Sequence, residues 1–206
     1  MSFRVWIWIV PAGLYAAFFL WYTNLSGPLT PGEVEHYMAV FESRTDDAAR
    51  LALLRRFMES DTGDDFLMLN MLHLKETPDL VDGVAPGATS EEVMGKYMEF
   101  MWPALLARAS HPVLFGPAVS NSLDVSGIED AGVWTGGAAM RYRSRRDMLD
   151  ISSNPAFSGR HEFKLAALEK TIAYPVEDDL FLTDPRFLLF FVLLSAAGVL
   201  NAVLRR

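Results

Sequence analysis

Two long apolar segments, one at each end of the chain, constrain its fold more than any other feature. The first, FRVWIWIVPAGLYAAFFLWY, has Arg4 as its single charge, and the second, FLLFFVLLSAAGVLNAVL, has none. A helix of about twenty apolar residues matches the thickness of a bilayer core. The sequence therefore predicts transmembrane helices at 1–24 and 179–206, with the lipid bilayer as a partner.

The first segment has an alternative interpretation as a cleaved signal peptide. Its apolar run is longer than the roughly 7–15 residues of a signal-peptide core, and no A-x-A cleavage site follows it. We therefore expect an uncleaved anchor.

The distribution of charge predicts an orientation in the membrane. The region between Thr23 and Pro185 holds 14 Lys or Arg and all 26 Asp or Glu, a net charge of −12. Arg4, Arg205 and Arg206 flank the apolar segments on the other side, and basic residues favour the cytoplasm. We expect a bacterial inner-membrane protein with both termini cytoplasmic and the acidic region periplasmic. That acidity argues against nucleic acid as a partner.

The middle of the chain predicts a helical lead-in at 25–60 and one α+β domain at 61–178. TPGE at Thr30 and TSEE at Thr89 are capping boxes that begin helices. Alternating or continuous apolar runs indicate strands. The predicted strands are 66–75, 111–119, 133–142 and 171–177, and the predicted helices between them are 90–110, a short one after 144, and 155–170.

The resulting order βαββαβ is the split-βαβ, ferredoxin-like arrangement, an antiparallel sheet with helices on one face. Its other face needs a cover, and a second copy of the domain is the simplest one. We therefore expect self-association through the sheet, or packing into a larger membrane complex.

Several short patterns resemble the dimeric α/β-barrel superfamily, and within it a family named only as a domain of unknown function. Met68–Met71 matches that family's M-x-N-L strand, and Tyr97 keeps half of its Y-x-x-Y helix. Tyr142–Arg145 matches its Y-P-S-R turn without the proline, and Lys164–Glu169 matches its R-x-A-A-L-E helix with Lys for Arg. The resemblance implies a ferredoxin-like domain that dimerises through its sheets. Superfamily members include cofactor-free monooxygenases, haem-degrading enzymes, isomerases and sensors, so the resemblance specifies fold more closely than function.

The first predicted strand carries Asn70 and His73, which point to opposite faces. We expect Asn70 to face the cavity of a half-barrel, where its amide either holds a ligand oxygen or is satisfied by neighbouring groups. His73 is expected to face the helices or solvent. Tyr97 either donates into the cavity from its helix or lies at the core boundary.

Basic residues near the third predicted strand have two interpretations. Arg141 and Arg143 share one face and either clamp a ligand carboxylate or pair with Asp and Glu of the acidic domain. Arg145, Arg146 and Arg160 are expected to be surface charges. The candidate ligand-binding residues are Asn70, Tyr97 and Arg141.

No cofactor or metal is predicted. His161 is a single imidazole on an amphipathic helix, which is weak support for a haem ligand. Met94, Met98 and Met101 share a helix face and suit core packing better than copper binding.

Two functions remain open. In the first, the domain is a non-catalytic accessory subunit or small-molecule-binding module of a membrane assembly. In the second, it is a cofactor-independent monooxygenase- or isomerase-like enzyme acting on a small apolar or aromatic molecule. The sequence does not decide whether the protein is an enzyme.

Overall fold

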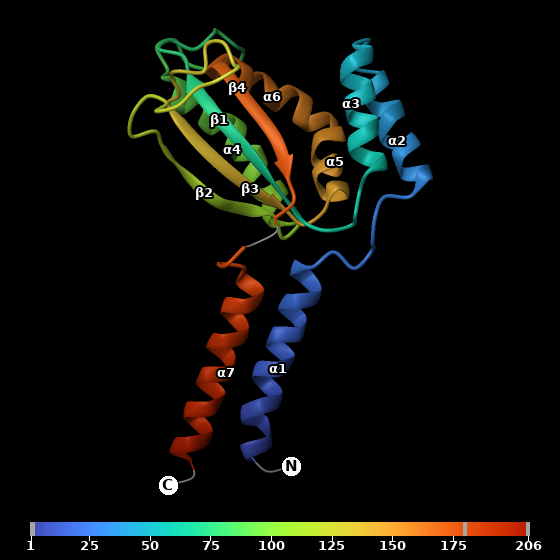
Figure 1. Cartoon of the computed structure of the whole chain (residues 1–206), viewed down its shortest axis with the longest axis vertical. Coiled ribbons are helices and arrows are strands. Elements are labelled where there is room, and N and C mark those ends of the chain that lie inside the picture. Colours follow the sequence, from blue (N-terminus) through green and yellow to red (C-terminus); the bar gives the residue numbers. More distant parts are fainter. Residues whose placement is uncertain (1–2, 179–180, 205–206) are drawn as a thin grey trace. The chain divides into compact units, whose positions relative to one another are not determined.

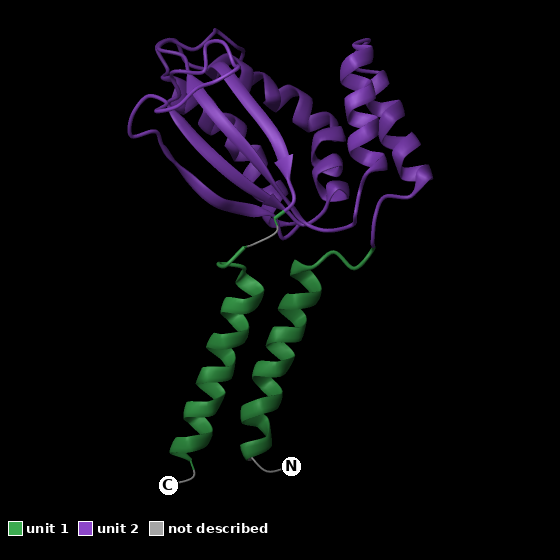
Figure 2. Cartoon of the chain, viewed as in Figure 1, with its two compact units in different colours: residues 1–26, 178–206 green, residues 27–177 purple. Residues whose placement is uncertain are grey.

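The computed structural model describes residues 3–178 and 181–204, and the chain divides into two compact units (Figure 2). One unit joins both ends of the chain, residues 1–26 and 178–206, and the other contains residues 27–177. The predicted lead-in therefore belongs to the same unit as the sheet, together with nearly all of the predicted domain.

The terminal unit consists of helices α1 (Phe3–Tyr22) and α7 (Pro185–Val203), which pack against each other. The ring of Tyr15 meets that of Phe190 edge-on at 5.5 Å between centroids, and Ala197 is buried. Both helices are long and apolar enough to cross a membrane, and few of their side chains are buried. A core helix of a soluble protein would instead bury most of its surface.

The second unit contains one four-stranded sheet, which is antiparallel throughout, with the strand order β2-β3-β1-β4. This order with βαββαβ connections defines the ferredoxin-like fold and confirms the predicted fold class (Figure 1). Its elements are α2 (Pro31–Glu42), α3 (Ala48–Glu59), β1 (Phe66–Leu74), α4 (Ser90–Leu106), β2 (His111–Pro117), β3 (Gly136–Tyr142), α5 (Arg145–Ser153), α6 (Pro155–Ala167) and β4 (Leu168–Val176).

Helices α4 and α6 cover one face of the sheet, behind the strands in Figure 1. Phe66 and Tyr142 stack at 5.4 Å between ring centroids and pack with Val93 and Leu105, both completely buried, from α4. Because side chains alternate along a strand, the same face of β1 also carries Met68 and Asn70.

The helix starts follow the capping chemistry that the sequence predicts. The hydroxyls of Thr30 and Thr89 each accept from the backbone N–H three residues later, and Glu33 and Glu92 accept from the N-cap backbone in return. Each pair of bonds satisfies donors that the first turn of a helix otherwise leaves unpaired.

The boundary between α6 and β4 differs from the prediction. The helix ends at Ala167 and the strand begins at Leu168, with no loop between them, whereas the sequence pattern extends the helix to 170. Leu168 pairs with Leu74 next to a register shift, and the Ala167 carbonyl accepts from the Lys75 N–H. Sheet pairing therefore overrides the local helix preference of ALEK.

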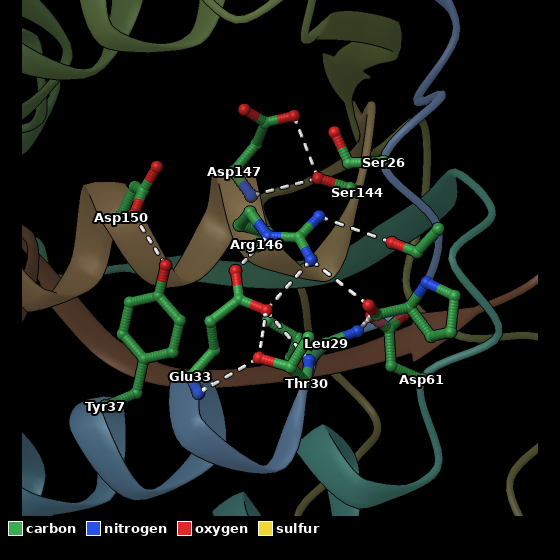
Figure 3. A network of polar contacts seen from close by, with 12 residues as sticks. Ser26, Leu29, Thr30, Glu33, Tyr37, Asp61, Ser144, Arg146, Asp147 and Asp150 are labelled. Carbon is green, nitrogen blue, oxygen red and sulfur yellow. Dashed lines mark hydrogen bonds and ion pairs between the residues drawn. The ribbon is translucent and has the colours of Figure 1, made fainter.

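The lead-in helices dock on α5 through a polar network (Figure 3). Arg146 donates to both carboxylate oxygens of Glu33, at 2.6 and 3.1 Å, and to the carbonyl of Pro28. The Tyr37 hydroxyl donates to Asp150 at 2.6 Å. Beneath this network, Val34, Met38, Met58 and Leu149 form a second apolar core.

Arg145 is not the surface charge that the sequence predicts. Only 9% of it is exposed, its guanidinium lies 4.7 Å from the Phe57 ring centroid, and it pairs with Glu177 at 2.7 Å and Asp61 at 3.6 Å. One side chain thus joins α3, α5 and the end of β4. Arg146 is likewise tied into the docking network.

Within the unit of residues 27–177, no helix lies over the other face of the sheet (Figure 1). It carries Leu69 and Met71 of β1 together with their β4 neighbours Tyr174 and Ile172. Tyr174 is 48% exposed and Met71 is 39% exposed. An apolar sheet face of this kind usually lies against another layer.

Candidate functional site

The structure corrects the predicted facing of Asn70. Its strand face packs against α4 and α6, because its neighbours Phe66 and Met68 belong to that core. His73 lies on the uncovered face, so it does not meet the helices. Sequence alternation separates the two residues correctly but does not say which face the helices cover.

Asn70 lies in the central strand with its amide bonded locally. Its Nδ2 donates to the Met68 carbonyl at 2.9 Å. In the described part of the chain its Oδ1 accepts no hydrogen bond. The amide oxygen can therefore receive a donor from a molecule between sheet and helices, which leaves both predicted roles open.

Tyr97 projects from the middle of α4 into the core and is 9% exposed. Burial, aided by nearby Tyr142, raises its pKa well above the ordinary value, so the phenol stays protonated. Its hydroxyl has no hydrogen-bond partner among the described residues. Tyr97 and Asn70 thus lie on the same side of the sheet.

Lys164 of α6 lies against Tyr97, with its ammonium 5.8 Å from the centre of the phenol ring. Within residues 3–178 and 181–204 it has neither an ion pair nor a hydrogen bond. Burial lowers its pKa from the ordinary lysine value, since an ammonium removed from water is less stable. An unpaired cation at a core boundary is uncommon.

His161 lies one helical turn before Lys164, on the same face of α6. Its ring stacks on Phe157 at 5.0 Å and meets the Tyr97 ring at 6.1 Å. Its Nδ1 is buried without a hydrogen-bond partner. Burial, together with the positive charges of Lys164 and Arg50, lowers the pKa of the imidazole, which favours its neutral form.

These side chains form one cluster between α4 and α6, which we call the α4–α6 cluster: Tyr97, Phe157, His161 and Lys164. His161 and Lys164 are half-buried, so the cluster reaches from the core to the surface. It combines two aromatic faces with a phenol, an imidazole and an ammonium, a set suited to holding a small polar-edged ring.

Arg141, the third predicted ligand contact, lies elsewhere. By alternation it faces away from α4 and α6, and only 1% of it is exposed. Its Nε donates to Asp65 at 2.6 Å and its Nη1 to the Ala109 carbonyl at 2.8 Å. Arg143 pairs with Asp147 at 2.8 Å. Both arginines therefore pair with carboxylates of the domain. Arg141 lies on the opposite side of the sheet from Tyr97, so the two residues do not form one site.

Lys164 was not predicted from the sequence as a site residue. A signal was present, because Phe157, His161 and Lys164 stand at i, i+4 and i+7, the spacing of a single helix face. A lysine on an otherwise aromatic stripe is unusual, but its long stem often reaches solvent from such positions.

Two surface hollows lie away from the cluster. One, of about 680 Å³, is lined by His36 and Val40 of α2, by Arg44 just after this helix, and by Ser153 and Ser158. Arg44 there donates to the carbonyls of Ser152 and Ser153. The other, of about 580 Å³, lies between α4 and the loop before it. Among the described residues, no three His, Asp or Glu side chains are grouped to hold a metal ion.

Comparisons with known proteins support the fold alone. No protein-family model and no curated protein matches the sequence. RPA0582, a protein of unknown function from Rhodopseudomonas palustris, matches with a TM-score of 0.52 and 18% identity over 63% of this chain and 94% of that one. Its methylated form gives a TM-score of 0.52 and 19% identity over 65% and 93%. SnoaB, a cofactor-independent oxygenase from Streptomyces nogalater, covers 59% of this chain and 99% of its own at 10% identity, and its TM-score of 0.36 carries no argument. The chain therefore shares its fold with RPA0582.

Proposed function

We propose that this protein is a membrane-anchored, self-associating and non-catalytic module that binds a small apolar or aromatic molecule between its sheet and helices. The α4–α6 cluster carries the proposal. Its imidazole Nδ1 is buried without a hydrogen-bond partner among the described residues, and buried polar groups are usually paired. The Tyr97 phenol and the Lys164 ammonium beside it also bond to no described residue. A bound molecule supplies the missing partners.

Anchoring in a membrane is supported by the composition of α1 and α7. Each is a helix of the length and apolarity needed to span a bilayer, and each leaves large side chains such as Trp6 and Phe191 exposed. Exposure of that much apolar surface is costly in water and favourable in lipid. We place the protein in a bacterial inner membrane, with the acidic domain periplasmic and both termini cytoplasmic.

Self-association is supported by the uncovered sheet face. Leu69, Met71, Ile172 and Tyr174 lie there side by side on the two paired strands β1 and β4. A second copy of the same face is complementary in chemistry and buries these side chains. The motif resemblance at Met68–Met71 and Lys164–Glu169 adds support for membership of the unknown-function family within the dimeric α/β-barrel superfamily.

The test is purification in a mild detergent from the native membrane, followed by native mass spectrometry of the intact assembly. A homodimer carrying an additional small mass is the expected result. A homodimer without one contradicts the binding role. A large complex with other proteins supports an accessory-subunit role instead and leaves the α4–α6 cluster a structural feature.

A second candidate function is a cofactor-independent enzyme, and one observation favours it. Tyr97, His161 and Lys164 all have pKa values displaced from their ordinary values and lie together, which is common at catalytic sites. A neutral imidazole can accept a proton from a bound molecule. Turnover of the co-purified molecule, abolished in His161→Gln and retained in Arg160→Gln, would establish this function over simple binding.

A further inference from the structure

The charge around the α4–α6 cluster is unusual for this domain. The region between the apolar ends is strongly acidic, and its buried arginines have carboxylate partners, as Arg141 has Asp65 and Arg145 has Glu177. Lys164 has none in the described ranges, although it lies deep enough for burial to lower its pKa. The charges that act on neighbouring His161 are also positive, those of Lys164 and Arg50.

An unpaired ammonium next to aromatic rings is stabilised only in part by the ring faces. The Tyr97 ring provides a cation–π contact at 5.8 Å, close to the outer limit of such contacts. A carboxylate or phenolate in the same place would form a charge-assisted hydrogen bond, which is considerably stronger. Of the groups in the cluster, Lys164 Nζ is therefore the one that can form the strongest bond to an anion.

The remaining groups define the rest of the ligand. The rings of Tyr97, Phe157 and His161 contact one another, so a flat ring would pack against the side of this aromatic group that reaches the surface. The Tyr97 hydroxyl and His161 Nδ1 offer further hydrogen bonds to polar atoms on the edge of that ring. An aliphatic anion would use the ammonium but not the rings, and a neutral ring would use the rings but not the ammonium.

We propose that the α4–α6 cluster binds a planar aromatic anion, a carboxylate or phenolate, with its acid group on Lys164 and its ring against the surface side of the Tyr97, Phe157 and His161 rings. The inference rests on the proposed small-molecule-binding function and adds the charge and shape of the ligand. It also assigns a role to Lys164, which lies on the matched helix KLAALE.

The test compares two nearly isosteric probes, salicylate and the uncharged salicylamide, on the full chain in lipid nanodiscs. Binding is measured by calorimetry, with empty nanodiscs correcting for partition into lipid. We expect salicylate to bind more tightly than salicylamide. Lys164→Met should weaken salicylate binding about tenfold or more, as expected for loss of a charge-assisted bond, and should leave salicylamide unchanged. Lys164→Arg should retain most of the affinity.

The control is Lys96→Met, since Lys96 precedes Tyr97 in α4 but lines the hollow between α4 and the loop before it. Circular dichroism and thermal unfolding establish that each variant is folded. Equal binding of both probes, unaffected by Lys164→Met, overturns the inference and leaves the proposed binding function standing. Absence of binding by either probe also overturns it. In that case an uncharged molecule found by native mass spectrometry preserves the proposed function, whereas a ligand-free homodimer contradicts both.

Discussion

Arg141 is a charged side chain whose partners are all within the protein. It is 1% exposed and joins Asp65, just before β1, to the Ala109 carbonyl, just before β2. Removing one member of such a buried pair leaves the other charge without compensation. The guanidinium therefore stabilises the fold at the strand ends, whatever the ligand.

We expect Arg141→Met to lower the free energy of unfolding by about 3–5 kcal/mol, the usual cost of breaking a buried ion pair. Chemical denaturation of the full chain in detergent measures it. Arg56→Met is the control, because Arg56 is exposed and makes no ion pair within the described residues. A loss below about 1 kcal/mol in Arg141→Met would instead indicate a solvent-like environment for the guanidinium.

At the residue scale, the sequence indicated which side chains could form polar contacts, but it did not predict how deeply each one is buried. Asn70 and Tyr97 were identified from motif positions, and both lie on the helix side of the sheet. Arg141 and Arg145 were not predicted to be buried, because burial of an arginine depends on carboxylates distant in sequence, 76 residues away for Asp65. Lys164 was not identified, because one sequence does not show whether a lysine on an apolar stripe finds an acceptor.

Strand β3 approaches its neighbour β2 unusually closely at one glycine. A Cβ at Gly136 would lie 2.9 Å from the Gly116 carbonyl oxygen, a backbone atom that cannot move independently. A Cβ at adjacent Gly137 would meet its nearest atom, the Asn70 carbonyl oxygen, at an ordinary 3.6 Å. Of the two adjacent glycines, only Gly136 is therefore required by the close approach of the two backbones.

Gly136→Ala should lower the free energy of unfolding by about 1–3 kcal/mol, the usual cost of overpacking. Gly137→Ala should change it little or raise it slightly, since alanine reduces the entropy of the unfolded chain. Thermal unfolding of the two single variants side by side makes the comparison. Equal effects of both substitutions would show that β2 shifts freely to make room.

The docking of α2 on α5 depends on an ionised Glu33. The Arg146 guanidinium, with the Thr30 backbone N–H, lowers the pKa of this carboxyl to about 2 from 4.5. A lowered pKa in the folded state stabilises the protein above the unfolded value, and this stabilisation is lost as the pH falls from about 4.5 toward 2. Protonation then leaves Arg146 without its main partner.

We expect hydrogen exchange in α2 to accelerate as the pH falls through this window, after correction for the intrinsic exchange rate. Glu33→Gln should show the accelerated exchange already at neutral pH and little further change on acidification. Glu35→Gln is the control, because Glu35 pairs with Arg55 of α3 and not with α5. Identical profiles in wild type and Glu33→Gln would mean that the apolar contacts of Val34 and Met38 hold α2 alone.

At the element scale, local signals were sufficient where a few adjacent residues determine the structure. The capping boxes at Thr30 and Thr89 begin their helices as predicted. The α6–β4 junction was wrong by several residues, because Leu168 enters the strand through pairing with Leu74, far away in sequence. The covered face of the sheet was also assigned wrongly, since strand alternation defines two faces without distinguishing them.

At the scale of the whole molecule, two apolar surfaces require partners of different kinds. The surfaces of α1 and α7 suit lipid. The open face of the sheet belongs to the unit of residues 27–177, which carries the acidic charge and in our proposal lies in the aqueous periplasm. A second copy of that sheet is the partner we propose for it, because an isologous contact matches the face with itself.

Met71 offers the sharpest test of this assembly. It is 39% exposed on β1, one of the two central strands, so Met71→Glu should not disturb the core of the isolated domain. In a two-fold contact, each new carboxylate lies in an apolar interface, near the same residue of the second protomer. Burial of an unpaired charge there costs several kcal/mol. We expect the full chain in detergent to shift from dimer to monomer, as measured by analytical ultracentrifugation. Leu80→Glu, at an 87% exposed loop position, should leave the dimer intact. A dimer that survives Met71→Glu would place the self-association elsewhere, and the open face of the sheet would then remain for a different protein.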